Sequence, residues 1–255
     1  MIGENKGGFS PSTSQKSVDT NRKEVIYDNY KTDVRFINNL LLHFVKNEAV
    51  NMKLGIKQAI LDKAIDLFYE VGFVKASIRD IAKDVSISKG TIYFHFKNKE
   101  EILYRILVDL NDFILAGLRQ IIQKNSDPVR ALKEMMYWQI CLTPQKRKEI
   151  KIYMEEQYLL SPELRKDVLR RHREVYELYY KKVCEIDSSL LRNFNRVTIT
   201  FSLFGMINWV YRWFRDDRSQ TIEQVAADIV RMAFFGFFKE EAIPGLKKIK
   251  AFETN

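Results

Sequence analysis

The sequence holds few of the residues that build metal centres or disulfide frameworks. Its 255 residues include two cysteines, Cys141 and Cys184, and three histidines, His43, His95 and His172, all well separated along the chain. Two distant cysteines fit a protein kept in a reducing compartment, and scattered histidines lack the spacing of metal ligands. We therefore expect no metal and no cofactor.

Signatures of catalysis are missing as well. The sequence contains neither a glycine-rich loop that would cradle a phosphate nor a nucleophile elbow. Carboxylates such as Glu155 and Glu156 are adjacent on a predicted helix, where consecutive side chains point in different directions. The sequence therefore argues against an enzyme.

Long hydrophobic runs without charge are also missing. The chain begins with a polar stretch that lacks the apolar segment of a signal peptide. The most apolar stretch, residues 201–214, follows Arg196 and contains Asn208 and Arg212, which are costly inside a bilayer. We expect a cytoplasmic protein without a membrane partner.

What the sequence does contain is material for a helical core together with an excess of positive charge. Hydrophobic residues make up 46% and aromatic residues 13%, as expected of a globular protein. The net charge of +9 suits a polyanionic partner, although charge alone is weak evidence. Every segment from residue 56 onward has helical periodicity and none alternates as a strand would, so the predicted fold is all-α.

Residues 77–95 have the pattern of two short helices joined by a tight turn. Ser77 is a good N-cap for the first helix, with Asp80 placed to complete a capping box. The turn is only Ser86 and Ile87, and Ser88 caps the second helix. This arrangement is typical of a helix-turn-helix, whose second helix enters the DNA major groove.

The run G-T-I-Y-F-H-F-K-N-K-E-E-I at residues 90–102 resembles the signature of the TetR family of transcriptional regulators. The upstream run L-D-K-A-I-D-L-F-Y-E-V-G-F at residues 61–73 is similar to the family's first helix, which ends at a glycine. The close match covers about residues 58–106. The resemblance implies a DNA-binding head over residues 52–98 and a helical body for ligand binding and dimerisation over residues 99–255.

Several head residues are candidates for contacting operator DNA. Lys89 is suited to guanine acceptors, and Gly90 allows a close backbone approach, the alternative being that it merely relieves helix crowding. Tyr93, His95 and Lys99 match positions that contact phosphates in the family, although His95 also fits the edge of a core. The candidates are Ser77, Arg79, Ser88, Lys89, Gly90, Thr91, Tyr93, His95 and Lys99. We assign three further residues to packing: Ile92, Phe94 and Phe96.

The second half of the chain suggests an effector. Residues 208–217 and 221–226 are similar to the C-terminal domain of the family's fatty-acid and acyl-CoA responsive members. The resemblance implies an amphipathic acid such as an acyl-CoA or a fatty acid as ligand. Candidate ligand residues are Arg170, Tyr176, Trp209 and Arg212.

Other interpretations of the body remain open. The basic run at residues 165–173 is also typical of a solvated helix face. The body is equally compatible with a solid aromatic core, or with a cationic-drug pocket in a regulator of an efflux pump. The carboxylates for such a pocket would come from Glu155, Glu156 or Glu174.

The last two helices carry more aromatic surface than one small body needs to bury, which predicts a homodimer. The expected interface residues are Phe201, Phe204, Trp213, Phe234, Phe235 and Phe238. We therefore expect a dimeric repressor released from a palindromic operator by a small molecule. The rival interpretation is an architectural protein that binds DNA without sequence preference.

Residues 1–51 precede the part of the chain that resembles the family. The first 20 residues predict a flexible tail, and residues 25–47 are apolar enough for one amphipathic helix. This segment is either a helix that docks on the body, an addition from cloning, or the result of a start placed too far upstream. We favour the last and predict that residues 1–51 are dispensable for operator binding.

Overall fold

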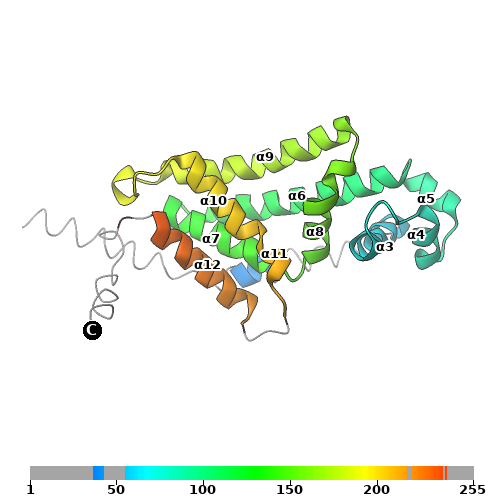
Figure 1. Cartoon of the computed structure of the whole chain (residues 1–255), viewed down its shortest axis with the longest axis horizontal. Helices are drawn as coiled ribbons and strands as arrows, with labels where there is room; N and C mark the ends of the chain where they lie inside the picture. Colours follow the sequence, from blue (N-terminus) through cyan, green and yellow to red (C-terminus); the bar gives the residue numbers. More distant parts are fainter. Residues whose placement is uncertain (1–36, 43–54, 217–219, 238, 240–255) are drawn as a thin grey trace, which may run out of the picture.

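The computed structural model describes residues 37–42, 55–216, 220–237 and 239, and these residues are nearly all helical (Figure 1). The head contains α3 (Gly55–Val71), α4 (Ile78–Val85) and α5 (Lys89–His95). The body contains α6 (Lys99–Lys124), α7 (Pro128–Cys141), α8 (Arg147–Glu156), α9 (Pro162–Glu185), α10 (Arg196–Asn208), α11 (Val210–Trp213) and α12 (Ile222–Phe237). Two single 3₁₀ turns, η1 (Gln157–Leu159) and η2 (Ser188–Leu190), flank α9. No strand occurs in the described ranges, which confirms the all-α prediction.

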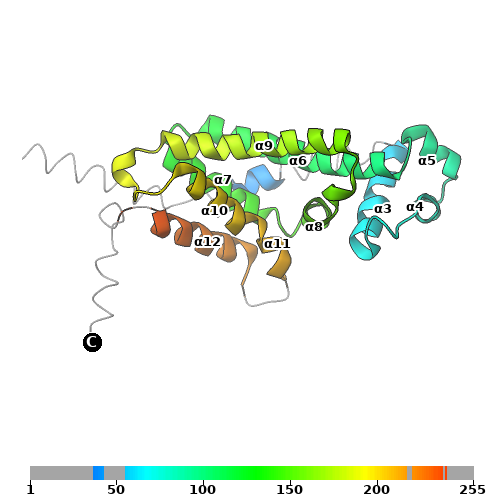
Figure 2. The same cartoon turned by 45° about the horizontal axis from the view of Figure 1, so that its top comes forward.

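The long helix α6 joins the head to the body. Figures 1 and 2 show the head at one end of the molecule, with α6 and α9 running side by side toward the other end. The hydrophobic cluster of the head also takes in the first turns of α6 and parts of α8 and α9, through Ile102, Leu103, Ile152 and Val168. The predicted boundary near residue 98 stays a prediction, because this cluster runs across it.

The helix starts follow local capping signals. The side chains of Ser77, Ser88 and Asn98 accept hydrogen bonds from the free N–H groups at the starts of α4, α5 and α6. Asp127 does the same for α7, whose first residue is Pro128. The caps at Ser77 and Ser88 confirm the predicted starts of α4 and α5, because a capping side chain acts within three residues of itself.

Close packing between α6 and α7 depends on one glycine. The ring of Trp138, which is fully buried, lies where a Cβ on Gly117 would come within 2.1 Å of it. The same indole stacks on Phe113 with ring centroids 6.2 Å apart. Gly117 therefore provides the space that lets a large aromatic side chain fill the centre of the body.

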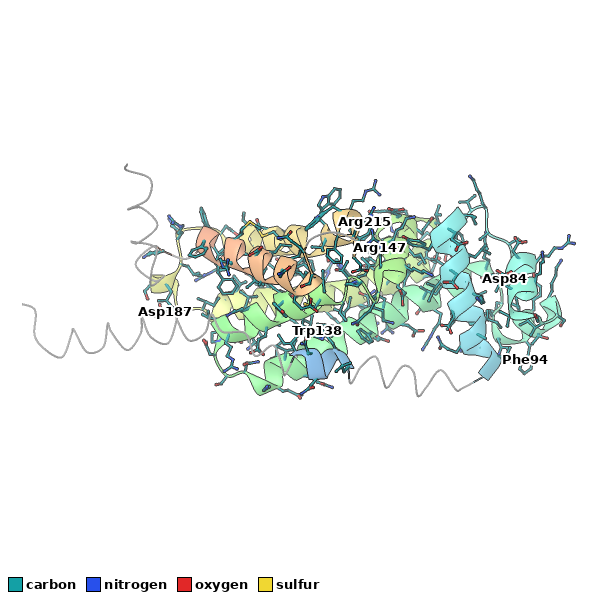
Figure 3. The ribbon with its side chains drawn as sticks, turned by 90° about the horizontal axis from the view of Figure 1, so that it is seen from below. Asp84, Phe94, Trp138, Arg147, Asp187 and Arg215 are labelled. Atoms are coloured by element: carbon teal, nitrogen blue, oxygen red, sulfur yellow. The ribbon has the colours of Figure 1, made fainter. Side chains whose placement is uncertain are left out.

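A helical segment before the head packs on the body. Residues 37–42 are helical, and Ile37, Leu40 and Leu41 are buried in the same hydrophobic cluster as Trp138. Figure 3 shows this segment, in blue, against the body close to Trp138. Among the three alternatives, this burial favours a helix that docks on the body. The predicted tail and the remainder of residues 25–51 lie outside the described residues.

Candidate functional site

The turn between α4 and α5 determines the orientation of α5, the recognition helix. Ser86 adopts a left-handed conformation (φ 61°, ψ 42°), which turns the chain within two residues before the Ser88 cap. Ile92 is completely buried and holds α5 against the head. The opposite face of α5 is therefore left to solvent, as a helix that enters the major groove requires.

The predicted DNA contacts gather on the α4–α5 end of the head. Arg79, Lys89, Gly90 and Tyr93 are exposed there, while Thr91 and His95 are half-buried on the same short helix. Two candidates also have a local role as helix caps, namely Ser77 and Ser88. The surface has the composition of a nucleic-acid interface, and the individual contacts stay predictions.

Phe94 is not a packing residue, contrary to the assignment made from the sequence. Its side chain is 84% exposed and meets only the edge of His95, with ring centroids 5.1 Å apart. Ile92 and Phe96 are four residues apart and share the buried face of the helix, so Phe94, midway between them, points away. Figure 3 places Phe94 at the outer end of the head.

Lys99 lies in the first turn of α6, but its ammonium points back into the head. It donates hydrogen bonds to the carbonyls of Phe73, Val74 and Ala76 at 2.6, 3.3 and 2.7 Å, and it lies over the Phe73 ring. Burial lowers the pKa of Lys99, and nearby Glu156 offsets part of that effect. Lys99 therefore holds the α3–α4 loop, and its contact with DNA phosphate stays a prediction.

The body encloses a cavity of about 50 Å³ between α6, α7, α8, α9 and the α10–α11 region. Most of its wall is apolar, from leucine, isoleucine and valine side chains. The polar groups in the wall are Asn111, Gln139, Thr143, Lys146, Tyr153, His172, Asn208 and Tyr211. An apolar cavity with a few polar groups is the usual form of a small-molecule site.

Two of these polar groups are held without charge. Burial lowers the pKa of His172, whose ring lies between Tyr153 and Phe204. Burial raises the pKa of Tyr153, and its hydroxyl makes no hydrogen bond of normal geometry within the described chain. The nearby Asn111 amide donates instead to the carbonyl of Leu107, at 2.8 Å. The Tyr153 hydroxyl is thus free to bond a ligand.

The ligand residues expected from the sequence do not line this cavity. Arg170 pairs with Asp167 and Glu174 on the surface, which fits the solvated-face alternative. Arg212 is likewise a surface residue, paired with Glu155 at 3.0 Å. Tyr176 packs among aromatic rings and Trp209 is 60% exposed. The cavity is instead lined by residues from α6 through α11, and no local sequence pattern marks them as a set.

The aromatic residues expected at a dimer interface divide into two groups. Phe204 and Phe234 are buried within the protomer and add no exposed surface, because each packs on neighbouring helices of its own chain. Phe201 and Trp213 are 61% and 39% exposed, Phe235 is half-buried, and Phe238 lies outside the described residues. Trp209, Met206 and Met232 add to the exposed apolar surface of α10–α12. Interface formation at this surface stays a prediction.

Helix α8 contacts the head on one side and the cavity on the other. Lys148 pairs with Asp66 of α3 at 2.6 Å, and Lys151 donates to the carbonyl of Tyr69 at 3.1 Å. Glu156 accepts from the N–H of Phe73 at 3.3 Å. At the other end, Arg147 donates to the Phe214 carbonyl after α11, and Figure 3 places it close to Arg215. Movement of α8 would therefore change both the cavity and the support of α3.

Comparison with known proteins agrees with this architecture. The family model described as bacterial regulatory proteins, tetR family, matches residues 60–106. The model described as tetracyclin repressor-like, C-terminal domain, matches residues 125–237. A helix-turn-helix head on a helical body with a cavity defines a DNA-binding transcriptional regulator. The chain belongs to the TetR family of these regulators.

Individual relatives cover most of the chain. The transcriptional repressor KstR2 of Mycobacterium tuberculosis is 24% identical over 184 residues, covering 71% of this chain and 92% of the relative. The solved structure of that regulator has a TM-score of 0.67 at 22% identity, covering 73% of this chain and 96% of its own. The structure of AibR in complex with isovaleryl coenzyme A and operator DNA has a TM-score of 0.65 at 29% identity, covering 70% and 97%. Within the described residues, no helix is long and apolar enough to cross a membrane.

Proposed function

We propose that the protein is a dimeric repressor that leaves its operator when an amphipathic acid, such as an acyl-CoA or a fatty acid, enters the body cavity. The observation that carries this proposal is the position of α8, which lines the apolar cavity and also supports α3 of the head. The similarity to a repressor and to an acyl-CoA complex supports it. The sequence similarity at residues 208–226 points to the same ligand class.

The small size of the cavity supports a coupling between ligand binding and the conformation of the body. Pockets for small molecules usually measure roughly 300–1,000 Å³, whereas this cavity measures about 50 Å³. A ligand therefore enters only if the lining helices move apart. Such a ligand binds a widened conformation in preference to the present one, which is the condition for shifting the population.

Helices α6 and α8 would transmit that movement to the head. Both helices line the cavity, and α6 continues directly from the recognition helix through Phe96 and Asn98. Half-sites for a helix-turn-helix dimer lie about 34–36 Å apart, or multiples of that spacing, so a modest shift of the heads removes the fit.

The test begins with the operator. Selection of bound sequences from a random duplex pool should return a palindrome, whereas an architectural protein would enrich no common sequence. The selected duplex is then titrated with an acyl-CoA series of increasing chain length. Release should strengthen with length, because each buried methylene contributes about 0.8 kcal/mol. No release at any length would contradict the proposed ligand class.

The alternative of a cationic-drug sensor finds no support in the cavity. Each of the three carboxylates considered from the sequence is engaged elsewhere. Glu155 pairs with Arg212, Glu174 pairs with Arg170, and Glu156 accepts from the Phe73 backbone. None of them lines the cavity in the described structure.

A further inference from the structure

Lys146 lies where the cavity meets a second, more polar space. This space is a cleft of about 410 Å³ between α3 of the head, α6, and the start of α8. Only Leu110 and Lys146 line both the cavity and the cleft among the described lining residues. Lys146 is thus the charged side chain that lines both the cavity and the head–body cleft.

The ammonium of Lys146 is paired on the cleft side. It lies 3.2 Å from a carboxylate oxygen of Glu149, and the two side chains are 14% and 16% exposed. It also lies over the Phe113 ring, 5.0 Å from the centroid. Because the pair is largely shielded from water, its charges act on neighbouring groups more strongly than surface charges would.

Glu149 shares the cleft with other acidic groups. Asp62 of α3 and Asp109 of α6 line the same space. Arg105 is committed to Asp109, with two contacts of 3.0 and 2.8 Å, and Asp62 accepts from the amide of Gln58 at 2.9 Å. Lys146 is therefore the cation bonded to Glu149 among the groups that line the cleft.

We propose that the Lys146–Glu149 pair is an electrostatic relay between an anionic ligand and the DNA-binding head. This inference rests on the proposed function, since it takes the cavity as the ligand site. A carboxylate or phosphate in the cavity attracts Lys146 and leaves Glu149 without compensation in the cleft that it shares with Asp62. Repulsion across the cleft then moves α3 away from α8. The cavity thus senses the negative charge of an amphipathic ligand as well as its apolar part.

The relay can be tested without any ligand. Lys146→Met keeps an unbranched side chain, shorter by one atom, and removes its charge, so Glu149 is left unpaired as in the liganded state. Operator affinity of this variant should fall about tenfold, and adding Glu149→Gln should restore it to within about twofold. Lys182→Met is the matched control, because Lys182 also pairs with the acidic residue three positions later, Glu185, at 2.6 Å on α9. It should leave operator affinity unchanged.

Charge sensing is tested with dodecanoate, dodecanoyl-CoA and the neutral dodecanol as probes. Wild-type protein should release the operator with one or both anions and much less with the alcohol. Glu149→Gln should bind the anionic probe at least as tightly but need about tenfold more of it for release. If only one of the two anions releases the operator, that result identifies carboxylate or phosphate as the group that is sensed.

The outcomes separate this inference from the proposed function. If no probe binds, the proposed ligand class fails, while the operator affinities of the variants still decide the relay. The relay is wrong if folded Lys146→Met binds operator as wild type does, or if Glu149→Gln fails to restore binding. Circular dichroism and urea unfolding establish that each variant is folded. Should Lys146→Met not fold, normal release by Glu149→Gln would contradict the relay by itself.

Discussion

The imidazole of His172 lies in the cavity wall, where burial favours its neutral form. Burial lowers its pKa below the 6.5 of a free imidazole. Between the folded and unfolded pKa values, the unfolded chain binds a proton that the folded chain does not. Stability should therefore fall as the pH drops below about 6.5, because protonation favours the unfolded state.

Urea unfolding at pH 7.5 and 5.5 measures this effect. His172→Gln removes the titrating group and should reduce the loss of unfolding free energy between the two pH values. The same loss in His172→Gln as in wild type would show that other groups cause the pH dependence.

Lys89 and Lys99 should respond differently to substitution, because one is exposed on α5 and the other is bonded to the α3–α4 loop. Lys89→Ala should cost about 1–3 kcal/mol in operator affinity and relax specificity at one base position. Lys99→Ala should lower the unfolding free energy of the head, because it leaves three carbonyls without their donor. Equal, sequence-independent losses of DNA affinity with unchanged stability in both variants would refute the distinction.

Single residues show what a sequence does and does not reveal. The caps at Ser77 and Ser88 were predictable because their partners lie within three residues. The inward turn of Lys99 was not, since its acceptors lie 23 to 26 positions away. Tyr153 and His172 come together only after α8 and α9 fold over α6. Local rules therefore located the DNA-binding helices and missed the cavity.

At the scale of elements, the contact between α6 and α7 gives a clear prediction. Gly117→Ala places a methyl group inside the Trp138 ring, and overpacking of a core typically costs about 1–3 kcal/mol. The unfolding free energy from urea titration should fall by that amount.

The matched control is another helical glycine. Gly205 of α10 has no neighbouring atom within 4 Å of an added Cβ in the protomer. Gly205→Ala should leave the unfolding free energy unchanged or raise it by up to about 1 kcal/mol, from better helix propensity. A similar loss in both variants would mean that the helix backbone, and not Trp138, sets the requirement at Gly117.

The break between α10 and α11 has no local sequence signal. The apolar stretch at residues 201–214 is divided between α10 and α11, which separate at Trp209. The sequence there has no proline, and its one glycine, Gly205, lies within α10 before the break. Trp209 still bonds back to the Gly205 carbonyl at 3.3 Å, so the interruption is small and follows from packing.

At the scale of the whole molecule, the exposed apolar surface of α10–α12 predicts a two-fold dimer. Phe201→Asp should shift the protein toward monomer in sedimentation velocity at micromolar concentration, because it places a charge in that surface. Tyr158→Asp is the control, since Tyr158 is also 61% exposed but lies on η1. A wild-type protein that sediments as a monomer would refute the dimer.

The docked segment at residues 37–42 changes the expectation for residues 1–51. Leu40 is 5% exposed and Leu42 is 52% exposed on the same helical turns. Leu40→Ala should lower the unfolding free energy by about 2–5 kcal/mol, whereas Leu42→Ala should change it by less than about 0.5 kcal/mol. Urea unfolding measures both. Equal small effects would show that the segment contributes little and that a chain starting at Met52 is self-sufficient.

That segment also has a consequence for the order in which the protein folds. Residues 37–42 leave the ribosome early, but the cluster that buries them is built from residues 113–237. Domains of a nascent chain generally fold as they emerge, with the N-terminal part first. Among the described residues, the first helical ones must therefore wait for nearly the last ones. The recognition helices therefore finish folding before the body is closed, and the newly made chain passes through a stage in which it has a DNA-binding head but no completed sensor.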